Sequence, residues 1–495
     1  MSDVELKDDE GEERPTKLNH TYICKVLKDR LTFYQSADGW PYVDAVVGGK
    51  RLACIDVNGA MVESVVYAVA AEIEPEGIPT TNVIKNVVNW VRANCRSAPK
   101  FPIEHRVNAV GHKLVYDTGR DDMFVEWEGG QWEERFGLHR FIRGNAALPQ
   151  VQAVRTKKTL VEAIEPFINA SRSDVVLCAA WLLGCFKVGG PYPVLVINGE
   201  QGSAKSTTTR FLRSIVDPHS LDLRDPLTRE ADYLPLLKNS WVLAFDNVSR
   251  VNEKFGDMIC RIATKTTFAT RELYTNGNEV GLSVTRPIIL NGIPNLNSRS
   301  DLVDRMVQVR LNPIDRQHRL DDDTYWHRVR QAMPEILGAL YDTVAKSLVE
   351  FELTELPYAH RMANFMRWAV AGIGDEFLKA YDVAVKASKQ SAIESNPFTQ
   401  AIVCLMAEQE QWHGTMPELD VALTKWRPVG YRAWPETDAQ RANALQRAKP
   451  DLRVACIDVY HTGKHPLNRR SQYMIKRTSE WGHMEFSSEV SVGEA

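Results

Sequence analysis

Apolar and polar positions alternate in short runs over the first third of the chain, which predicts strands there. The runs with strand character are residues 31–34, 42–47, 51–55, 113–116 and 123–128. Between the third and fourth runs, apolar residues recur at helical spacing near 60–73 and 80–96. Gly129-Gly130 follows the last run and predicts a hairpin turn. This pattern predicts a small α+β domain, whose role the sequence leaves open.

The pattern then changes to helices and continuous apolar strands. Residues 155–190 have helical spacing and lead into the apolar run 194–198. Two more apolar runs, 241–245 and 287–290, each end next to a polar residue, which predicts two more buried strands of an α/β core. From about 316 to 390 the spacing is again helical.

The last part of the chain, 397–478, predicts a helix, a short helix, a third helix and a strand pair. Thr415 or one of its neighbours is expected to open the second helix, and Thr437-Asp438 is expected to cap the third. The strand pair is predicted over 452–460 and 471–476. This order of elements is the pattern of a winged helix.

Composition and charge place few limits on function. Of 495 residues, 44% are apolar and 25% charged, as in ordinary soluble proteins, and the net charge of −4 gives no general attraction to nucleic acid. The eight cysteines form no C-x-x-C pair, and no secretory signal is visible. The most apolar run, 175–186, is too short to cross a bilayer. We expect a cytoplasmic protein of a bacterial or phage-infected cell, without a membrane partner.

The strand at 194–198 continues into a glycine-containing loop and a helix-compatible segment, which is the context of a phosphate-binding P-loop. Loop amides and the helix N-terminus would hold phosphate, Lys205 would reach the β- and γ-phosphates, and Ser206 would bind Mg²⁺. Ala204 replaces the second glycine of the usual motif. The predicted ATP-binding residues are Gly199, Glu200, Gln201, Gly202, Ser203, Ala204, Lys205, Ser206 and Thr207.

Two further strands supply candidate catalytic groups. The run 241–245 ends at Asp246, which predicts a second Mg²⁺ ligand, as in a Walker B strand. Asn247 follows where many ring ATPases have a catalytic Glu, so either Asp246 serves twice, another acid orients the water, or hydrolysis is slow. A third strand lying between the first two would bring Asn291 beside the γ-phosphate.

Basic residues near these strands are candidates for contacts with a neighbouring subunit or with DNA. Arg305 follows Asp301-Leu-Val-Asp304 and is predicted to be an arginine finger, with a surface ion pair as the alternative and Arg286 and Arg299 as lesser candidates. Asn276-Gly277 predicts a hairpin flanked by Lys265 and Arg271, which would either face DNA in a ring pore or simply cover the sheet edge.

The order of these motifs resembles that of the superfamily 3 helicase ATPases, within the AAA+ class. The phrases at 190–206, 268–274 and 286–293 resemble the ATPase part of phage and mobile-element primase–helicases and related stand-alone bacterial ATP-binding proteins. The resemblance covers roughly 155–390. It implies a homo-oligomeric ring, expected to be a hexamer, that hydrolyses ATP at subunit interfaces and moves along single-stranded or forked DNA.

The predicted winged helix carries basic residues suited to phosphate contacts, and no acid occurs between 459 and 478. The candidates are Arg441, Arg447, Lys464, Arg469, Arg470, Lys476 and Arg477. The alternative is that this domain packs on the ring or binds protein, and that its basic residues form a solvated face.

We therefore expect an α/β fold with seven segments: a P-loop core of AAA+ type, a small α+β domain before it and a winged-helix-like domain after it. The segments are a disordered acidic tail (1–16), the N-terminal domain (17–150), a helical lead-in (151–190), the ATPase core (191–315), a helical extension (316–392), the winged-helix-like domain (393–478) and a flexible tail (479–495).

The function expected from these features is a DNA-dependent ATPase, a ring helicase or translocase for replication of a phage or mobile element, with ATP and Mg²⁺ as ligands. Two alternatives remain: an ATP-binding switch with little turnover, and a P-loop phosphotransferase acting on a small molecule. Measured turnover separates a switch from a motor. The motifs do not distinguish replication from mobile-element maintenance or defence.

Overall fold

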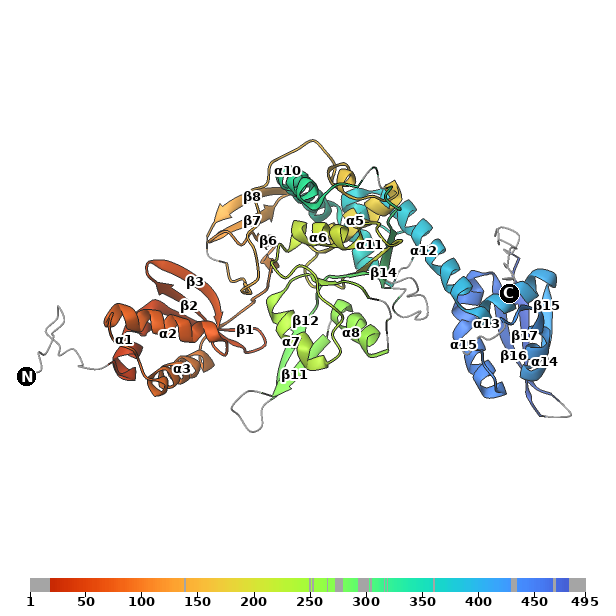
Figure 1. The fold of residues 1–495 in the computed structure, drawn as a ribbon, viewed down its shortest axis with the longest axis horizontal. Helices are drawn as coiled ribbons and strands as arrows, with labels where there is room; N and C mark the ends of the chain where they lie inside the picture. The colour runs from red at the N-terminus through yellow and green to blue at the C-terminus, as the bar shows by residue number, and fades with distance from the viewer. Residues whose placement is uncertain are drawn as a thin grey trace, which may run out of the picture.

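The computed structural model describes residues 18–137, 139–248, 251, 253–264, 266–271, 279–292, 302, 305–315, 317, 319–358, 361–428, 434–465 and 469–479. The predicted tail at 1–16 lies outside this set, as does the predicted tail at 479–495 except for residue 479. Figure 1 shows an N-terminal unit, a central unit and a C-terminal unit in a row, with the long helix α12 (Asp375–Ser395) leading from the second to the third. Among the described residues, no helix has the length and apolar character needed to span a membrane.

The N-terminal unit is a four-stranded sheet covered by three helices. The strands, in the order β3-β2-β1-β4, are β1 (Leu31–Ser36), β2 (Pro41–Val47), β3 (Lys50–Asp56) and β4 (Lys100–Phe101). The helices are α1 (His20–Arg30), α2 (Ala60–Ile73) and α3 (Thr81–Arg96). Apolar side chains of both layers, such as Val43, Val66 and Val87, form one core. The alternation of the first three strands and the period of the last two helices therefore predicted these elements correctly.

A second, antiparallel sheet follows in the order β5-β6-β7-β8. Its strands are β5 (Val107–Val110), β6 (Lys113–Asp117), β7 (Met123–Glu128) and β8 (Gln131–Phe136), and the last two are joined by the predicted turn at Gly129-Gly130. Trp127 packs edge-on against Tyr341, a residue of helix α10 (Asp322–Glu350), and its indole N–H donates to the Tyr341 carbonyl at 2.9 Å. This sheet therefore shares its core with the central unit, not with the first sheet.

The central unit is built on a four-stranded parallel sheet. Its strands, in the order β10-β13-β9-β14, are β9 (Val194–Asn198), β10 (Leu243–Phe245), β13 (Ile288–Asn291) and β14 (Met306–Arg310). Three helices of this unit are α6 (Lys205–Val216), α7 (Glu230–Asn239) and α8 (Glu253–Thr264). Because the strands are parallel, their carboxyl ends meet at one edge of the sheet and their amino ends at the other.

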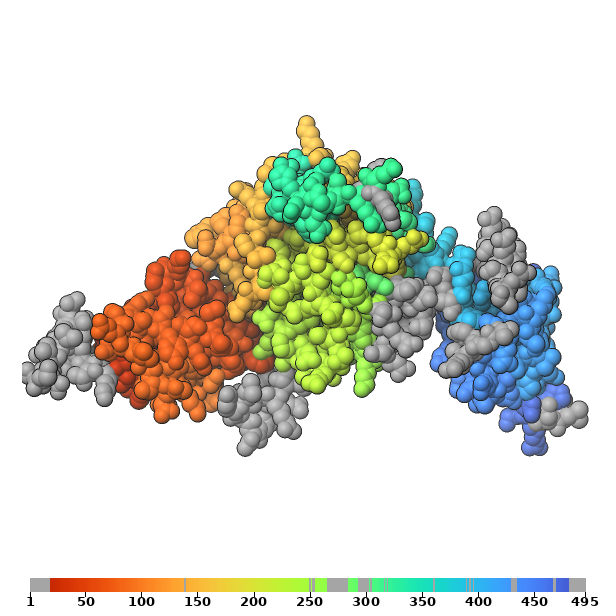
Figure 2. All heavy atoms as spheres, in the orientation of Figure 1, coloured from red at the N-terminus to blue at the C-terminus, as the bar shows by residue number. Residues whose placement is uncertain are grey.

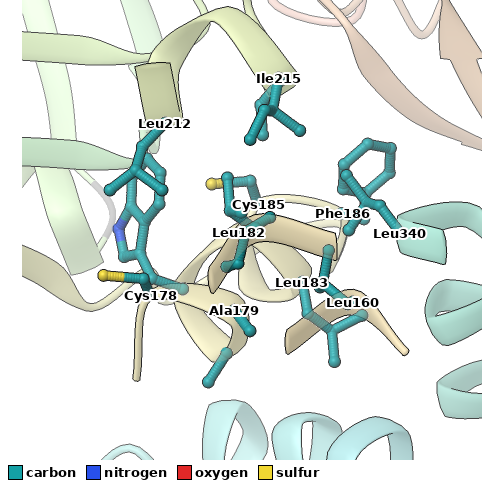
Figure 3. Close-up of a cluster of buried hydrophobic side chains, with 14 of the residues drawn as sticks. Leu160, Cys178, Ala179, Leu182, Leu183, Cys185, Phe186, Leu212, Ile215 and Leu340 are labelled. Carbon is teal, nitrogen blue, oxygen red and sulfur yellow. The ribbon is translucent and has the colours of Figure 1, made fainter. Parts of the chain in front are cut away.

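A helical layer packs against this sheet. It contains α4 (Leu160–Ile164), the short 3₁₀ helix η1 (Glu165–Phe167), α5 (Arg172–Gly184), α10, α11 (Ala363–Ile373) and α12. Every residue from Val175 to Gly184 is buried, and Figure 3 shows side chains of α5 meeting Leu212 and Ile215 of α6 and Leu340 of α10. The most apolar run of the sequence is therefore a core helix.

The helical lead-in differs from the prediction. Residues 155–159 are not helical, because Thr159 caps α4 with a capping box to Glu162 and so fixes its start at Leu160. Pro166 lies in η1, and Ser171 begins a new helix by accepting a hydrogen bond from the Asp174 amide. Two capped helices therefore replace the single helical stretch.

The C-terminal unit contains the three predicted helices and one strand more than predicted. Its elements are α13 (Pro397–Glu408), β15 (Gln411–Thr415), α14 (Met416–Ala422), η3 (Thr424–Trp426), α15 (Asp438–Val454), β16 (Ile457–Lys464) and β17 (Ser471–Arg477). Thr415 and Thr437 form capping boxes at the predicted helix starts. Residues 452–454, predicted as strand, continue α15, because Leu452 is buried in the core shared by these helices. The unpredicted β15 pairs with β17, in the sheet order β15-β17-β16.

The predicted hairpin of the central unit is present as β11 (Thr266–Arg271) paired with β12 (Glu279–Val284). The Asn276-Gly277 turn lies outside the described residues, as does Lys265. Arg271 is the last residue of β11 and pairs in register with Glu279, which places it at the start of the turn segment.

Candidate nucleotide-binding site

Three positions in the loop between β9 and α6, Gly199, Gly202 and Ala204, have positive φ angles. Gly202 has a φ of 81°, which favours glycine. A Cβ on Gly199 would lie 2.5 Å from the Ser203 hydroxyl, so no larger residue fits. Ala204, at the helix N-cap, has φ 63° and ψ 32°. This left-handed conformation costs an alanine about 1–2 kcal/mol, which explains why glycine is usual at this place.

Lys205 begins α6 and turns back over the loop. Its ammonium donates to the Gly199 carbonyl at 2.8 Å and to the Glu200 carbonyl at 2.7 Å. The lysine is therefore held at the loop by two neutral acceptors, which the more strongly accepting oxygens of a phosphate can replace.

The next residue, Ser206, links the loop to strand β10. Its hydroxyl donates to Oδ1 of Asp246 at 3.0 Å, and the same carboxylate oxygen accepts from the Asn247 amide at 3.0 Å. Ser206 and Asp246 are both half-buried. A hydroxyl and a carboxylate this close together form an oxygen donor set that fits Mg²⁺, which binds few protein ligands and keeps waters and phosphate oxygens as the rest.

Asn247 follows Asp246 with a φ of 52° and an exposed side chain. Asparagine tolerates this left-handed region better than glutamate does, because its short amide can form local hydrogen bonds. The backbone therefore gives a physical reason for asparagine at the position where a catalytic glutamate is absent.

Asn291 ends β13, which lies between β9 and β10. Its side chain is 1% exposed, donates to the Thr209 hydroxyl at 2.8 Å and accepts from the Asn247 amide at 3.2 Å. Both ends of the amide are thus bound to protein. Asn291 lies at the right edge of the sheet, but its contacts give it the role of holding the Asn247 turn against α6.

Arg305 lies at the opposite edge of the sheet. It precedes β14, its carbonyl accepts from the Val194 amide at 2.9 Å, and Val194 is the first residue of β9. The nucleotide loop follows the last residue of β9, whereas Arg305 is bonded to the first. The length of β9, roughly 16 Å at about 3.3 Å per residue, therefore separates the Arg305 backbone from the loop. The half-buried guanidinium has the Cys260 sulfur at 3.9 Å. Arg305 is therefore outside the site of its own chain.

Arg286, a lesser candidate for the same role, is an internal residue. It is 4% exposed and donates to the backbone carbonyls of Ser240, Thr285 and Leu237 and to the ring of His105 at 3.0 Å. Burial, with Arg286 beside it, lowers the pKa of His105 to about 3, so the ring is neutral and can accept. Arg286 thus cannot reach a neighbouring subunit. Arg299, Asp301 and Asp304 lie outside the described residues.

One positively charged side chain lies near the loop although no sequence motif predicts it. Arg319, in the segment between β14 and α10, places Nη2 only 2.8 Å from where a Cβ on Gly202 would stand. It is exposed, and no ion pair joins it to the acidic residues that begin α10 within the described part of the chain. An arginine about 115 residues beyond the loop matches no motif, and only the fold brings it there.

The predicted DNA-contact residues of the C-terminal unit separate into two groups. The first group consists of Arg441 and Arg477, which bind other groups of the protein. Arg441 is 8% exposed and pairs with Asp420 at 2.6 Å and Asp438 at 3.1 Å, so it joins α15 to α14. Arg477 donates to the carbonyls of Met406, Ala407 and Gln409 and so caps the end of α13. Protein groups therefore bind both guanidinium groups in this structure, and contact of these two arginines with DNA stays a prediction.

The remaining basic residues are exposed but do not form one stripe. Lys464 ends β16, and Arg469 and Arg470 precede β17, so these three lie at the tip of that hairpin. Lys476 pairs in register with Asp458 at the other end of the hairpin. Arg447 is exposed on α15. The tip is the place where basic residues gather.

Family models match most of the chain beyond residue 160. Residues 161–388 match the model described as actinomycete integrative conjugative element replication protein, and residues 398–488 match the model of the AICE RepA C-terminal domain. The chain is similar to mobile-element replication proteins. The first match covers the parallel sheet and its helical layer, and the second covers the C-terminal unit.

Solved structures give a weaker likeness, and no curated protein matches. Two apo structures of the NrS-1 C-terminal region match with TM-scores of 0.35 and 0.37 and identities of 11% and 12%. The first covers 74% of this chain and 75% of that one, and the second covers 79% and 82%. A third, an A-form apo structure of the same region, has a TM-score of 0.38 at 10% identity and covers 92% and 99%.

Proposed function

We propose that this chain binds and hydrolyses Mg²⁺–ATP and works as a DNA-dependent ring motor in replication of its mobile element. The observation that carries the proposal is the 3.0 Å contact between Ser206 and Asp246. It joins the first turn of the helix that follows a glycine loop to the carboxyl end of β10, a parallel strand of the same sheet. A phosphate group in the loop and a cation at this pair would then be in contact.

Each residue of the site has a defined role in this proposal. The loop amides and the positive end of α6 hold the phosphate chain, and Lys205 exchanges its two carbonyl partners for phosphate oxygens. Ser206 and Asp246 would hold Mg²⁺, which supplies positive charge beside the β- and γ-phosphates when bound. Asn291 fixes the turn that carries Asp246, and Arg319 adds a positive charge from the same chain.

The position of Arg305 supports hydrolysis between subunits. An arginine at the amino edge of the sheet cannot serve its own loop, but a ring can bring it to the loop of the next subunit. Placed there, a guanidinium stabilises the charge that develops on the transferring phosphoryl group. We propose a hexameric ring with one site at each interface.

Contact with DNA is proposed through the C-terminal unit and the β11–β12 hairpin. The three helices and three-stranded sheet of the C-terminal unit follow the order of a winged helix, and its basic hairpin tip is suited to phosphates. Single-stranded or forked DNA is the substrate expected of a replicative motor.

The test is steady-state ATP hydrolysis without DNA, with single strands and with duplex, using Lys205→Ala as the blank. The proposal requires turnover that DNA stimulates and that the variant lacks. Turnover that survives Lys205→Ala would remove the loop from the proposal. Charge reversal at Arg469 and Arg470 should weaken DNA binding and lower the salt slope by about one per lost phosphate contact, while unchanged DNA affinity would exclude the hairpin tip.

A second function, an ATP-dependent switch, is favoured by one observation. Asn247 has a left-handed backbone that disfavours glutamate, so the turn after Asp246 is built without the usual base. A switch predicts tight ATP binding with negligible turnover under every DNA condition, and the same experiment decides between the two.

A further inference from the structure

The N-terminal unit has no part in the proposed function, and its charged residues are sorted between two of its helices. Helix α2 carries two acidic residues, Glu63 and Glu72, and no basic one. Helix α3 carries three basic residues and no acidic one, and the segment 77–103 around it lacks Asp and Glu altogether. In a chain whose net charge is −4, α3 is therefore a local region of positive charge.

The exposed side of α3 has a regular composition of amides and cations. Val87 and Val91 lie on the opposite side, buried in the core of the unit. Residues on the exposed side recur at helical spacing from Asn82 to Arg96, and all of them are exposed except Arg92, which is half-buried. We call this set the α3 stripe, and it consists of Asn82, Lys85, Asn86, Asn89, Arg92, Ala93 and Arg96.

Asparagine is not the residue type that a helix surface favours. Ala, Glu, Lys and Gln are better helix formers, and no core packing at these exposed positions requires an amide. Within the described part of the chain, Asn82 and Asn86 make no side-chain hydrogen bond. Lys85 and Arg96 make no ion pair there. These side chains are therefore available to a ligand outside the chain.

One contact holds the middle of the α3 stripe in place. Arg92 donates through Nε to Oδ1 of Asn58 and through Nη1 to Oδ1 of Asn89, both at 3.1 Å. Asn58 lies between β3 and α2, so the contact ties α3 to a second segment of the unit. A side chain that is already held loses less conformational freedom when it binds a ligand. Asn89 is thus positioned before any partner arrives.

The shape and chemistry of the α3 stripe fit the major groove of duplex DNA. The helix has 16 residues and spans about 24 Å at about 1.5 Å per residue, and a groove about 12 Å wide admits a helix. An asparagine amide can donate to N7 of adenine and accept from N6 at once, and Lys and Arg side chains reach phosphates. The stripe therefore has groups for both base and backbone contacts.

Other nucleic acids and acidic proteins fit the α3 stripe less well. Single strands bind to exposed aromatic rings, but Trp90, the one aromatic residue of α3, is half-buried and packs edge-on with Phe33, their ring centroids 5.7 Å apart. An RNA duplex has a major groove that side chains cannot read. An acidic protein surface would be matched by cations alone and would not require three amides.

The α3 stripe also lies on the side of the molecule that carries the other elements proposed to contact DNA. Figure 1 shows α3, the β11–β12 hairpin and the β16–β17 hairpin extending toward the lower side of the view. Figure 2 shows atoms of the N-terminal unit, in orange, along this lower border and beside the yellow-green central unit. One DNA molecule passing along this side can therefore contact all three elements.

We propose that the α3 stripe binds duplex DNA in the major groove, with its asparagines on base edges and with Lys85 and Arg96 on the phosphate backbone. Because asparagine pairs with adenine, the bound sites contain A·T pairs at the contacted positions. This contact gives the chain a hold on duplex DNA that is separate from the two hairpins and independent of ATP turnover.

The first test measures binding of the full chain to a random-sequence duplex of about 20 base pairs, roughly two helical turns, by fluorescence anisotropy at several salt concentrations. The protein carries Arg469→Glu and Arg470→Glu, so that the proposed hairpin tip does not contribute. Adding Lys85→Glu and Arg96→Glu should lower the affinity at least roughly tenfold. It should also reduce the slope of log affinity against log salt concentration by about two.

The matched control is Lys50→Glu with Lys157→Glu, two exposed lysines outside α3 whose reversal changes the net charge equally. An equal loss of affinity in this control would mean that net charge attracts DNA, and not the α3 stripe. No duplex binding at all once the hairpin tip is reversed would overturn the proposal and leave the DNA contact of the proposed function intact.

A second variant guards against a loss that comes from unfolding. Lys85→Gln with Arg96→Gln removes the two charges without adding acids, and an unchanged melting temperature shows that the protein is folded. The salt slope should again fall by about two. An unchanged slope in this folded variant would overturn the proposal.

Base reading is tested by selection from a duplex library with a randomised centre. The starting protein should select A·T pairs at fixed positions, and Asn82→Ala with Asn86→Ala should weaken that preference roughly fivefold or more at one or two of them. Alanine is the better helix former, so this loss cannot come from unfolding of α3. No sequence preference in the starting protein, or an equal effect of the α3 substitutions on binding of single strands or of an RNA duplex, would overturn docking in the major groove.

Discussion

The two edges of the parallel sheet differ in how many groups of the proposed ATP site a single chain places there. At the carboxyl edge, Ser206 donates to Asp246, the Asn247 amide donates to Asp246 and Asn291, and Lys205 donates to two loop carbonyls. At the amino edge, Arg305 has a sulfur contact and no nucleotide loop nearby. In the proposed ring, the carboxyl edge would bind ATP and the amino edge would supply a positive charge to the next subunit. The proposed catalytic centre would then be complete only between two subunits.

The largest effect is expected from Asp246→Ala. Loss of the carboxylate would remove the proposed Mg²⁺ ligand, so turnover should fall about 10⁴-fold, the equivalent of several kcal/mol of lost charge stabilisation. Phosphate release measures this effect, and Asp225→Ala, an exposed carboxylate nearby, serves as the control. A loss of less than tenfold would show that the carboxyl edge does not hold the metal.

Arg305→Ala should lower turnover about 10³-fold, at the lower end for an arginine finger, with unchanged affinity for an ATP analogue. If the arginine acts on the next subunit, mixing this variant with Asp246→Ala subunits should restore part of the activity. Where an Arg305→Ala subunit provides the ATP site and an Asp246→Ala subunit provides the arginine, that interface has both groups intact. Mixtures as inactive as their components would contradict the comparison of the two edges. If Arg305→Ala lowers the melting temperature as well as the turnover, the lost activity would come from the lost Cys260 contact and not from a missing arginine finger.

Arg319→Ala tests the carboxyl edge with a residue that the sequence does not indicate. Loss of one charge at the loop should weaken binding of a fluorescent ATP analogue roughly tenfold, about 1.4 kcal/mol. Arg319→Lys should recover part of the affinity, and Arg328→Ala, an exposed arginine of α10, should bind normally. Unchanged affinity in Arg319→Ala would mean that the guanidinium lies near Gly202 without serving the ligand.

The smallest effect is expected from Ala204→Gly. Relief of the left-handed strain gains about 1–2 kcal/mol, and the greater freedom of glycine in the unfolded chain offsets about half of it. Chemical denaturation should therefore show a gain of about 0.5–1 kcal/mol, with ATP affinity equal or higher. A loss of stability would show that the methyl group of Ala204 makes contacts that outweigh the strain.

Sequence reasoning was most accurate where neighbouring residues decide the outcome. The capping boxes at Thr415 and Thr437, the turn at Gly129-Gly130 and the strand that precedes the loop all depend on residues within a few positions of each other. It did not foresee contacts between residues that are far apart in the sequence. The structure binds Arg441 to Asp420 and Arg477 to the end of α13, and no local pattern indicates either contact.

The amino-acid sequence by itself determined the strand–loop–helix at 194–216 and the place of Asp246 after a buried strand, because apolar period and glycine position are local properties. Only the tertiary structure decided that β13 lies between β9 and β10, that Arg305 stands at the far edge, and that Arg319 reaches the loop. It also brought α3 and the two hairpins to one side of the molecule. These juxtapositions join residues far apart along the chain, so they follow from how whole layers pack and leave no periodic trace in the sequence.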